Sequence, residues 1–239
     1  MEACRDGNNR NVGGGKGSRK GTPQGGVISP LLSNIYLHLL DRTWVRQHLE
    51  KRLGARLVPY AEDFVVLCKV GTEVPMKAIS RLLSRLELSL NESKTKVLDA
   101  QVSNFDFLGF ELRIGKSLST GNSFPYVQPS KKSLGRIKDR VTRLTCRKRT
   151  PVTLDRIMRE SNSSLQGWVG YFHYRNSSRS LSHLKYHVEE QLRTPLRKRH
   201  KVKERASGYK RFSSGGLYGK YRLYKVPTTA GWKKANAFG

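Results

Sequence analysis

The stretch LVPYAEDFVVLCK, residues 57–69, decides how the first half of the chain folds. Two runs rich in β-forming apolar residues, Leu57–Ala61 and Phe64–Cys68, flank the acidic pair Glu62 and Asp63. Two such runs separated by a short polar break are typical of a β-hairpin. The sequence therefore predicts two antiparallel strands with two carboxylates at their tip.

Helical periodicity surrounds this hairpin in the sequence. Upstream, apolar residues recur every three or four positions, which predicts a helix from Pro30 towards Glu50 with Ser29 as its N-cap. Downstream, a second apolar face predicts another helix, and this face consists of Met76, Ile79, Leu82, Leu83 and Leu86.

Two further strands are expected after these helices. The segment Asn91–Leu98 leads into one strand, and Phe105–Arg113 forms another. Helices and antiparallel strands in this order predict an α+β domain over residues 21–128, with the helices packed on the sheet. Residues 1–20, which are polar and rich in glycine, are expected to form a flexible lead-in.

The hydrophobic period is helical throughout from Pro129 onward. Four apolar faces predict four helices in a small all-α bundle over residues 129–200, with Ser130 as the cap of the first. The four faces are Leu134, Ile137, Val141 and Leu144; Leu154, Ile157 and Met158; Leu165, Trp168, Val169 and Phe172; and Leu181, Leu184, Val188 and Leu192. A basic tail of residues 201–239 follows, and we expect its aromatic side chains to stack on nucleic-acid bases.

The charge of the chain points to its partner. The net charge of +28 results from 46 Lys and Arg against 18 Asp and Glu. Residues 131–239 hold 28 basic and 6 acidic residues, whereas residues 1–130 hold 18 and 12. Such an excess repels itself unless a polyanion neutralises it, so nucleic acid is the expected partner, although a run of cations can also be a solvated surface. The cations expected to bind RNA are Arg136, Lys138, Arg140, Arg143, Arg147, Lys148, Arg149, Arg193, Arg197, Lys198, Arg199, Lys201 and Lys203.

Composition argues against several other classes of protein. Cys4, Cys68 and Cys146 lie far apart and form no CxxC pair, which disfavours a disulfide framework or a zinc site. The residues His183 and His187 share a helix face without a third metal ligand nearby, so we expect a surface role for them. No apolar run approaches the ~20 residues of a membrane span, and the polar start is unlike a signal peptide. We therefore expect a cytoplasmic protein without a membrane partner.

Six segments carry a resemblance to a known family. Four of them resemble consecutive blocks of the reverse transcriptases encoded by group II introns, and two resemble the maturase-specific thumb of the same class. The four blocks are GTPQGGVISPLLSNIYLHLLD (residues 21–41), YAEDFVVLC (60–68), LSLNESKTKV (88–97) and FDFLGFELR (105–113); the thumb segments are SLQGWVGYF (164–172) and HLKYHVEEQLR (183–193). The resemblance implies the second half of a polymerase palm followed by a thumb.

The resemblance also implies an activity. Proteins of this class are RNA-directed DNA polymerases that bind their intron RNA and assist splicing and mobility, with dNTPs as substrates and a DNA target or primer as a further partner. Glu62 and Asp63 correspond to the catalytic acidic pair, which holds the Mg²⁺ that nucleotidyl transfer requires. An acidic pair at a turn is otherwise a common surface feature.

Six more positions match residues that the family uses around its substrates. The resemblance places Pro23, Gln24, Gly25 and Lys94 near the template and the incoming nucleotide, and Leu108 and Gly109 in a turn that supports the primer end. Each position also has a plain structural interpretation: Gln24 as a polar turn residue, Lys94 as a solvated charge, and Gly109 as a bulge in a strand.

Two departures from the family pattern bear on catalysis. The family has aspartate where this chain has Glu62, whose extra methylene shifts the carboxylate by about 1 Å, enough to misplace an octahedral metal. A further family aspartate belongs to an earlier palm strand, but Asp6 lies in no strand pattern. We therefore expect an N-terminally truncated, polymerase-deficient member of the family. The alternatives are a non-catalytic RNA-binding maturase fragment or gene remnant, and a generic basic RNA-associated protein.

Overall fold

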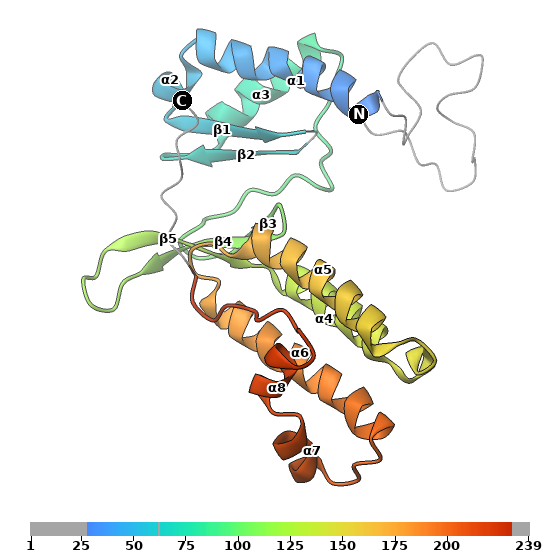
Figure 1. Cartoon of the computed structure of the whole chain (residues 1–239). Coiled ribbons are helices and arrows are strands. Elements are labelled where there is room, and N and C mark those ends of the chain that lie inside the picture. Colours follow the sequence, from blue (N-terminus) through green and yellow to red (C-terminus); the bar gives the residue numbers. More distant parts are fainter. Residues whose placement is uncertain (1–27, 62, 231–239) are drawn as a thin grey trace, which may run out of the picture. The chain divides into compact units, whose positions relative to one another are not determined.

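The computed structural model describes residues 28–61 and 63–230 (Figure 1). These residues form two compact units, which divide between Val97 and Leu98. Both units contain helices and antiparallel strands, so the predicted α+β class is confirmed. The expected flexible lead-in of residues 1–20 lies outside the described residues. Within them, no helix is both long enough and apolar enough to cross a bilayer.

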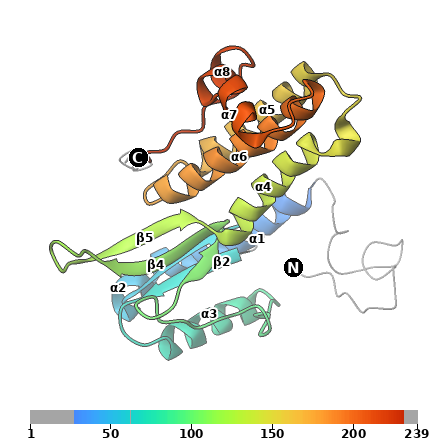
Figure 2. The same ribbon diagram turned by 90° about the horizontal axis from the view of Figure 1, so that it is seen from below.

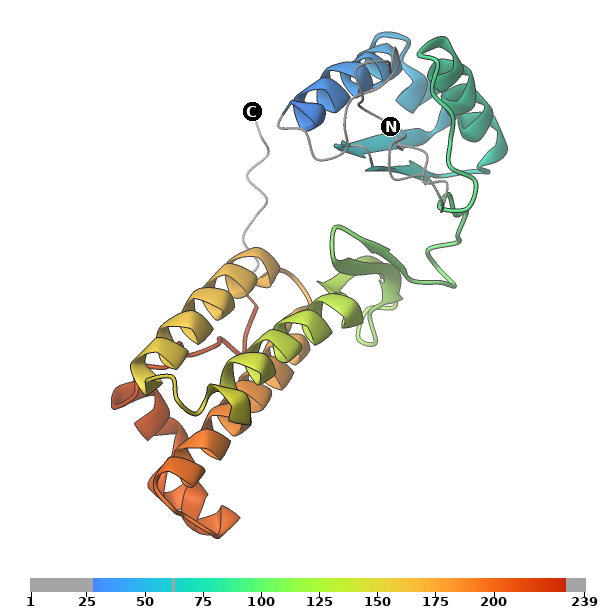
Figure 3. The same cartoon turned by 90° about the vertical axis from the view of Figure 1, so that its right-hand side faces the viewer.

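The first unit consists of three helices and one β-hairpin. Its elements are α1 (Ser29–Arg46), α2 (Leu49–Leu53), β1 (Ala55–Tyr60), β2 (Asp63–Cys68) and α3 (Glu73–Arg85). The predicted hairpin is confirmed, because β1 and β2 pair antiparallel from Ala55 opposite Cys68 to Tyr60 opposite Asp63. The helices α1 and α3 cover one face of this strand pair (Figure 3), and the buried side chains between them include Leu40, Trp44, Leu57 and Ile79.

The first helix differs from its prediction at both ends. The N-cap is Ile28 and Ser29 is already helical, so the assignment of Ser29 as the cap is wrong. The helix ends at Arg46 instead of near Glu50, because His48 adopts a left-handed conformation with φ of 49°. This turn starts the short helix α2, whose first residue, Leu49, is buried in the core.

The apolar residues of α1 lie on two sides of the helix. Leu40 and Trp44 face the core, and the Trp44 indole donates a hydrogen bond of 3.2 Å to the Ala55 carbonyl. Leu31, Ile35 and Leu39 share the helical spacing but are exposed. Periodicity thus predicted the helix correctly, but the first unit buries only one of its two apolar sides.

The strand predicted from Asn91–Leu98 does not form. The segment turns instead, with the Thr95 amide donating to the Asn91 carbonyl at 2.8 Å and the Lys94 amide to the Asn91 side-chain oxygen at 3.2 Å. Side chains such as Asn and Thr compete with a strand ladder by bonding the nearby backbone. Lys94 therefore lies in an exposed turn and not in a strand.

The second unit begins with a three-stranded antiparallel sheet of order β3-β4-β5. The strands are β3 (Phe105–Phe107), β4 (Phe110–Lys116) and β5 (Ser123–Pro129). The single strand predicted over Phe105–Arg113 is in fact a hairpin, because the chain reverses at Leu108-Gly109 and Phe107 pairs with Phe110. The strand β5 was not predicted, since it contains two prolines; prolines are tolerated there because β5 is an edge strand.

Three long helices and two short ones complete the second unit (Figure 2). They are α4 (Lys131–Thr145), α5 (Leu154–Phe172), α6 (Ser178–Arg199), α7 (Arg205–Arg211) and α8 (Ser214–Gly219), with a 3-10 turn at Arg147–Arg149. The predicted cap of α4 is confirmed, since the Ser130 hydroxyl accepts a hydrogen bond from the Ser133 amide at 3.1 Å.

Two of the four predicted bundle helices are one continuous helix, α5. The polar residues in its middle do not interrupt it, because the Asn162 side chain bonds outside the helix, donating to the Arg222 carbonyl at 2.7 Å and accepting from the Tyr224 amide at 2.8 Å. An asparagine side chain often disrupts a helix by bonding to the nearby backbone, but the side chain of Asn162 bonds to a distant segment instead.

The described part of the tail, residues 201–230, packs onto the bundle. Phe212, Leu217, Leu223 and Val226 are buried in the same core as α4, α5 and α6, and Tyr218, Tyr221 and Tyr224 pack against it. The expectation that the tail aromatics are available for base stacking is therefore wrong for Phe212, which is 1% exposed. The apolar residues of the tail are spaced irregularly among glycines and cations. Their spacing therefore gave no periodic signal that they pack on the core.

The core of the second unit yields a stability prediction. Leu165 is fully buried in the core, whereas Leu118 is fully exposed. We expect Leu165→Ala to lower the free energy of unfolding by about 2–5 kcal/mol, because the truncation leaves a cavity. Leu118→Ala is the matched control and should stay within about 0.5 kcal/mol of the parent. Denaturant titration measures both values, and equal effects would contradict the assigned core.

Candidate nucleic-acid interface

The tip of the first hairpin holds one described residue of the predicted catalytic pair. Asp63 is the first residue of β2, lies opposite Tyr60 and is exposed. Alternation along β1 buries Ala55 and Leu57 against the helices, so Asp63 lies on the other, open face of the strand pair. Glu62 lies outside the described residues.

The other predicted substrate-contacting residues divide between described and undescribed parts. Pro23, Gln24 and Gly25 lie outside the described residues, and Lys94 lies in the turn that follows α3. Across residues 28–61 and 63–230, no three His, Cys, Asp or Glu side chains gather closely enough to hold a metal ion. Asp63 alone therefore represents the predicted Mg²⁺ site in this structure. Its carboxylate oxygen is the ligand type that Mg²⁺ prefers.

The Leu108-Gly109 turn is clamped between the sheet and the helices of the second unit. Both residues have left-handed backbones, with φ of 51° and 79°. The Gly109 carbonyl accepts hydrogen bonds of 2.9 Å from the Ser130 amide and from the Ser133 hydroxyl. The Leu108 carbonyl accepts one of 3.1 Å from the hydroxyl of Tyr171. The turn is thus held by the start of α4 and the end of α5.

Glycine is required at position 109 for two reasons. Its φ lies in the region that side chains disfavour, and an added Cβ would lie 2.8 Å from the Ser133 hydroxyl oxygen and 3.1 Å from the Phe172 ring. The prediction of a turn at this position is confirmed, and the alternative of a strand bulge is not. Its role at a primer end stays a prediction.

The aromatic side chains near the end of α5 differ in how much of each is exposed to solvent. Phe172 is buried, and Trp168 packs against the same core, as expected. Tyr171 is 52% exposed, and its hydroxyl donates a hydrogen bond to the Leu108 carbonyl of the neighbouring turn.

An exposed row of arginines runs along α4. Arg136, Arg140 and Arg143 are spaced four and three residues apart, so they share one face of the helix, and all are exposed. Lys132, which the sequence analysis did not select, precedes Arg136 by four residues and is also exposed. The other exposed members of the predicted set are Arg147, Lys148, Lys198, Lys201 and Lys203, while Lys138 is half-buried. Helical spacing alone could have identified Lys132.

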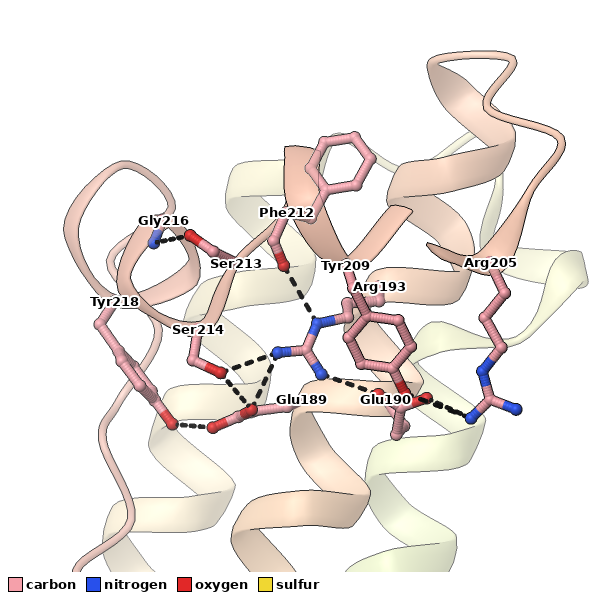
Figure 4. A network of polar contacts seen from close by, with 10 residues as sticks. All are labelled: Glu189, Glu190, Arg193, Arg205, Tyr209, Phe212, Ser213, Ser214, Gly216 and Tyr218. Atoms are coloured by element: carbon pink, nitrogen blue, oxygen red, sulfur yellow. Dashed lines mark hydrogen bonds and ion pairs between the residues drawn. The ribbon is translucent and has the colours of Figure 1, made fainter. Parts of the chain in front are cut away.

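Four other predicted RNA-binding arginines are engaged within the protein. Arg149 forms an ion pair of 2.8 Å with Glu160, Arg197 donates to the Lys203 carbonyl at 2.8 Å, and Arg199 donates to the Thr150 and Val152 carbonyls. Arg193 is 6% exposed and is bound to Glu189, Glu190, Ser214 and the Phe212 carbonyl (Figure 4). We therefore leave Arg193 out of the phosphate-binding surface.

The two histidines of α6 differ: His183 has the expected surface position, whereas His187 is half-buried, so a surface role is wrong for it. The Nε2 atom of His187 lies 3.2 Å from both the Thr142 hydroxyl and the Lys138 carbonyl, and so links α6 to α4. Burial lowers the pKa of His187, which keeps the ring neutral at physiological pH. His183 is exposed.

Comparison with known proteins adds to this geometry. A family model described as reverse transcriptase (RNA-dependent DNA polymerase) matches residues 4–112, and one described as group II intron, maturase-specific domain, matches residues 134–213. The first match contains the Asp63 hairpin and the Leu108-Gly109 turn, and the second contains the arginine row of α4. The two matches define a reverse transcriptase-type protein that also carries a maturase-specific domain. The chain belongs to the family of group II intron-encoded reverse transcriptases and maturases.

Two curated relatives are similar to parts of this chain, and the name of the second agrees with this family. Protein YkfC of Escherichia coli (strain K12) is 33% identical over 133 residues, which cover 42% of this chain and 34% of that protein. The group II intron-encoded protein LtrA of Lactococcus lactis subsp. cremoris is 39% identical over 80 residues, which cover 33% of this chain and 12% of that protein. The chain thus spans much less than two thirds of either relative.

The clamped turn yields a second prediction. We expect Gly109→Ala to lower the free energy of unfolding by about 1–3 kcal/mol more than Gly121→Ala, because only position 109 adds crowding to backbone strain. Gly121 is the matched control, with a φ of 69° and no atom within 4 Å of an added Cβ. Denaturant titration of the two variants gives the comparison. Equal losses would show that Ser133 and Phe172 do not crowd the turn.

Proposed function

We propose that this protein binds group II intron RNA through the exposed and half-buried cations of its helical unit and acts in splicing as a maturase. The observation that supports this most directly is the arginine row of α4, which lies within the segment matched to the maturase-specific domain. In this proposal residues 21–128 correspond to part of a polymerase palm, residues 129–200 to the thumb, and residues 201–239 to its basic extension.

The charge balance supports RNA as the partner. Residues 131–239 hold 6 acidic residues, and Glu160, Glu189 and Glu190 among them are already paired with arginines of the fold. The arginines of α4 therefore have few acidic neighbours to neutralise them. Phosphates of a polyanion are the natural counter-charges for such a row. The proposed RNA-binding set consists of Lys132, Arg136, Lys138, Arg140, Arg143, Arg147, Lys148, Arg149, Arg197, Lys198, Arg199, Lys201 and Lys203.

The polymerase part of the proposal depends on the first hairpin. Asp63, together with Glu62, would hold Mg²⁺, which proteins often bind through one or two carboxylates and the phosphates of a substrate. Bound there, the metal would neutralise charge on the incoming dNTP during nucleotidyl transfer. The proposed neighbours of the dNTP, template and primer are Pro23, Gln24, Gly25, Lys94, Leu108 and Gly109. A DNA target or primer is the implied second partner.

We further propose that the chain alone is polymerase-deficient. The departure that supports this is Glu62, where the family pattern has aspartate. An error of about 1 Å in the position of a catalytic group can cost about a hundredfold in rate. A non-catalytic RNA-binding maturase is therefore the second candidate function, and it shares the same RNA surface.

The salt dependence of RNA binding tests the proposed surface. We expect the triple variant Arg136→Gln, Arg140→Gln and Arg143→Gln to flatten the slope of log affinity against log salt by about 2, since each phosphate contact contributes about 0.7–0.9. The matched control is Lys77→Gln, Arg81→Gln and Arg85→Gln, three exposed cations of α3. Filter binding with a structured RNA over a salt series gives the slopes. A salt-independent affinity, or the same change in both triples, would contradict the assignment.

A primer-extension assay tests the proposed deficiency. With a primed RNA template, dNTPs and Mg²⁺, we expect no extension by the unmodified chain, because the longer side chain of Glu62 misplaces the metal. The variant Glu62→Asp should extend the primer better than the parent if that residue is the limiting defect. RNA binding by the same preparations is the control for folding. Clear extension by the parent that Glu62→Ala abolishes would make it a working polymerase.

A further inference from the structure

A hollow of about 380 Å³ lies where α7 packs beside the second half of α6. The residues of its lining on which the inference rests are Tyr186, Glu190, Arg193, Arg197, Arg205 and Tyr209. Pockets for small ligands usually measure about 300–1,000 Å³, so this one suits a ligand of the size of a single nucleotide. It lies within the second unit, and its lining residues fall within the segment 134–213 that matches the maturase-specific domain.

The floor of the hollow is a buried ion pair. Arg193 contacts Glu189 at 3.0 Å and Glu190 at 2.7 Å, and its Nε donates to the Phe212 carbonyl at 3.0 Å (Figure 4). The hydroxyls of Ser214 and Tyr218 both donate to Glu189. Because these partners come from α6, from the C-cap of α7 and from α8, the network joins the two short helices to the long one.

The pKa shifts agree with a tightly satisfied network. Burial raises the pKa of the Glu189 carboxyl, but hydrogen bonds from Ser214, Tyr218 and Arg193 outweigh burial and lower it overall. Burial and the Glu189 carboxylate together raise the pKa of Tyr218. At neutral pH the floor is therefore an ion pair whose carboxylate is also hydrogen-bonded by Ser214 and Tyr218.

The walls of the hollow combine tyrosines with arginines. The guanidinium carbons of Arg193 and Arg205 lie 4.7 and 5.7 Å from the centre of the Tyr209 ring. Arg205 also contacts Glu190 at 2.9 Å and the Tyr209 hydroxyl at 3.3 Å. Tyr186 stands at the edge of the hollow and is 61% exposed.

The charge and the exposed ring select a class of ligand. Three arginines line the hollow, and the carboxylates paired with them are those of Glu189 and Glu190, so one positive charge is left over to attract an anionic group. An exposed tyrosine offers a flat face for stacking, which phosphate alone or an acidic peptide would not use. A ligand with both a phosphate and a flat ring is a nucleotide. Unpaired RNA bases are commonly held by aromatic rings and guanidinium planes.

We propose that this hollow binds one unpaired nucleotide of an RNA, with its base on Tyr186 and its phosphate beside Arg205. The inference rests on the proposed RNA-binding function and deepens it. It adds a site for one unpaired nucleotide to a surface that otherwise binds phosphates. The arginine row of α4 supplies affinity without regard to base pairing, whereas the hollow distinguishes a bulged nucleotide from a paired one.

Two RNAs that differ only in one bulged nucleotide test the proposal. We expect the full chain to bind the bulged duplex about tenfold more tightly than the fully paired one, the equivalent of about 1.4 kcal/mol, which a single stacked base can supply. Tyr186→Ala should abolish this preference and leave affinity for the paired duplex unchanged, while Tyr186→Phe should retain it. Tyr36→Ala, which removes an exposed tyrosine of the first unit, is the matched control.

The outcomes separate this inference from the proposed function. If the parent binds both RNAs equally, or if Tyr186→Ala weakens both equally, the hollow is not a nucleotide site although RNA binding stands. If neither RNA binds, the proposed function itself fails. Competition gives a second arm: nucleoside monophosphates should remove the preference for the bulge at concentrations where inorganic phosphate does not. Equal competition by phosphate, or by an acidic peptide, would overturn the role of the base.

Discussion

The second unit depends on a two-residue turn that only a permissive backbone can make. Leu108 and Gly109 expose their carbonyl groups to the start of α4 and the end of α5, and three hydrogen bonds from Ser130, Ser133 and Tyr171 fix them there. Because the Ser130 hydroxyl also caps α4, one serine sets both the beginning of the helix and its attachment to the sheet. The direction of the arginine row on α4 follows from this attachment.

In a chain with this much positive charge, some arginines stabilise the fold and others face the solvent. The arginines that stabilise the fold have acidic partners: Glu160 pairs with Arg149, and Glu189 and Glu190 pair with Arg193. A buried charge without a partner costs several kcal/mol, so the scarce acids are found where arginines enter the interior. Surface arginines such as Arg156 and Arg205 share these same carboxylates, so three glutamates serve four arginines and the unit keeps a large positive excess, as the proposed binding of a polyanion requires.

The sequence predicted those parts of the fold in which a local pattern and its tertiary setting agree. The hairpin around Asp63, the helix α3 and the Ser130 cap have strong local signals and formed as predicted. The prediction failed where a distant partner overrides the local signal. The prolines of β5 disguise a strand that is allowed only at a sheet edge, and Asn162 stays helical because the segment Arg222–Tyr224 satisfies its side chain.

Distant partners also explain which residues of the candidate site could be predicted from the sequence. Asp139 precedes Arg143 by four residues as Glu189 precedes Arg193, so the sequence gives both arginines the same potential partner. Yet Arg143 is exposed and Arg193 is buried. The difference comes from α7 and α8, whose Phe212 and Ser214 bond to Arg193 and cover it. Hydrophobic periodicity did not predict how the tail packs. The tail nevertheless decides that Arg193 stabilises the fold, while Arg143 faces the solvent, where a phosphate can reach it.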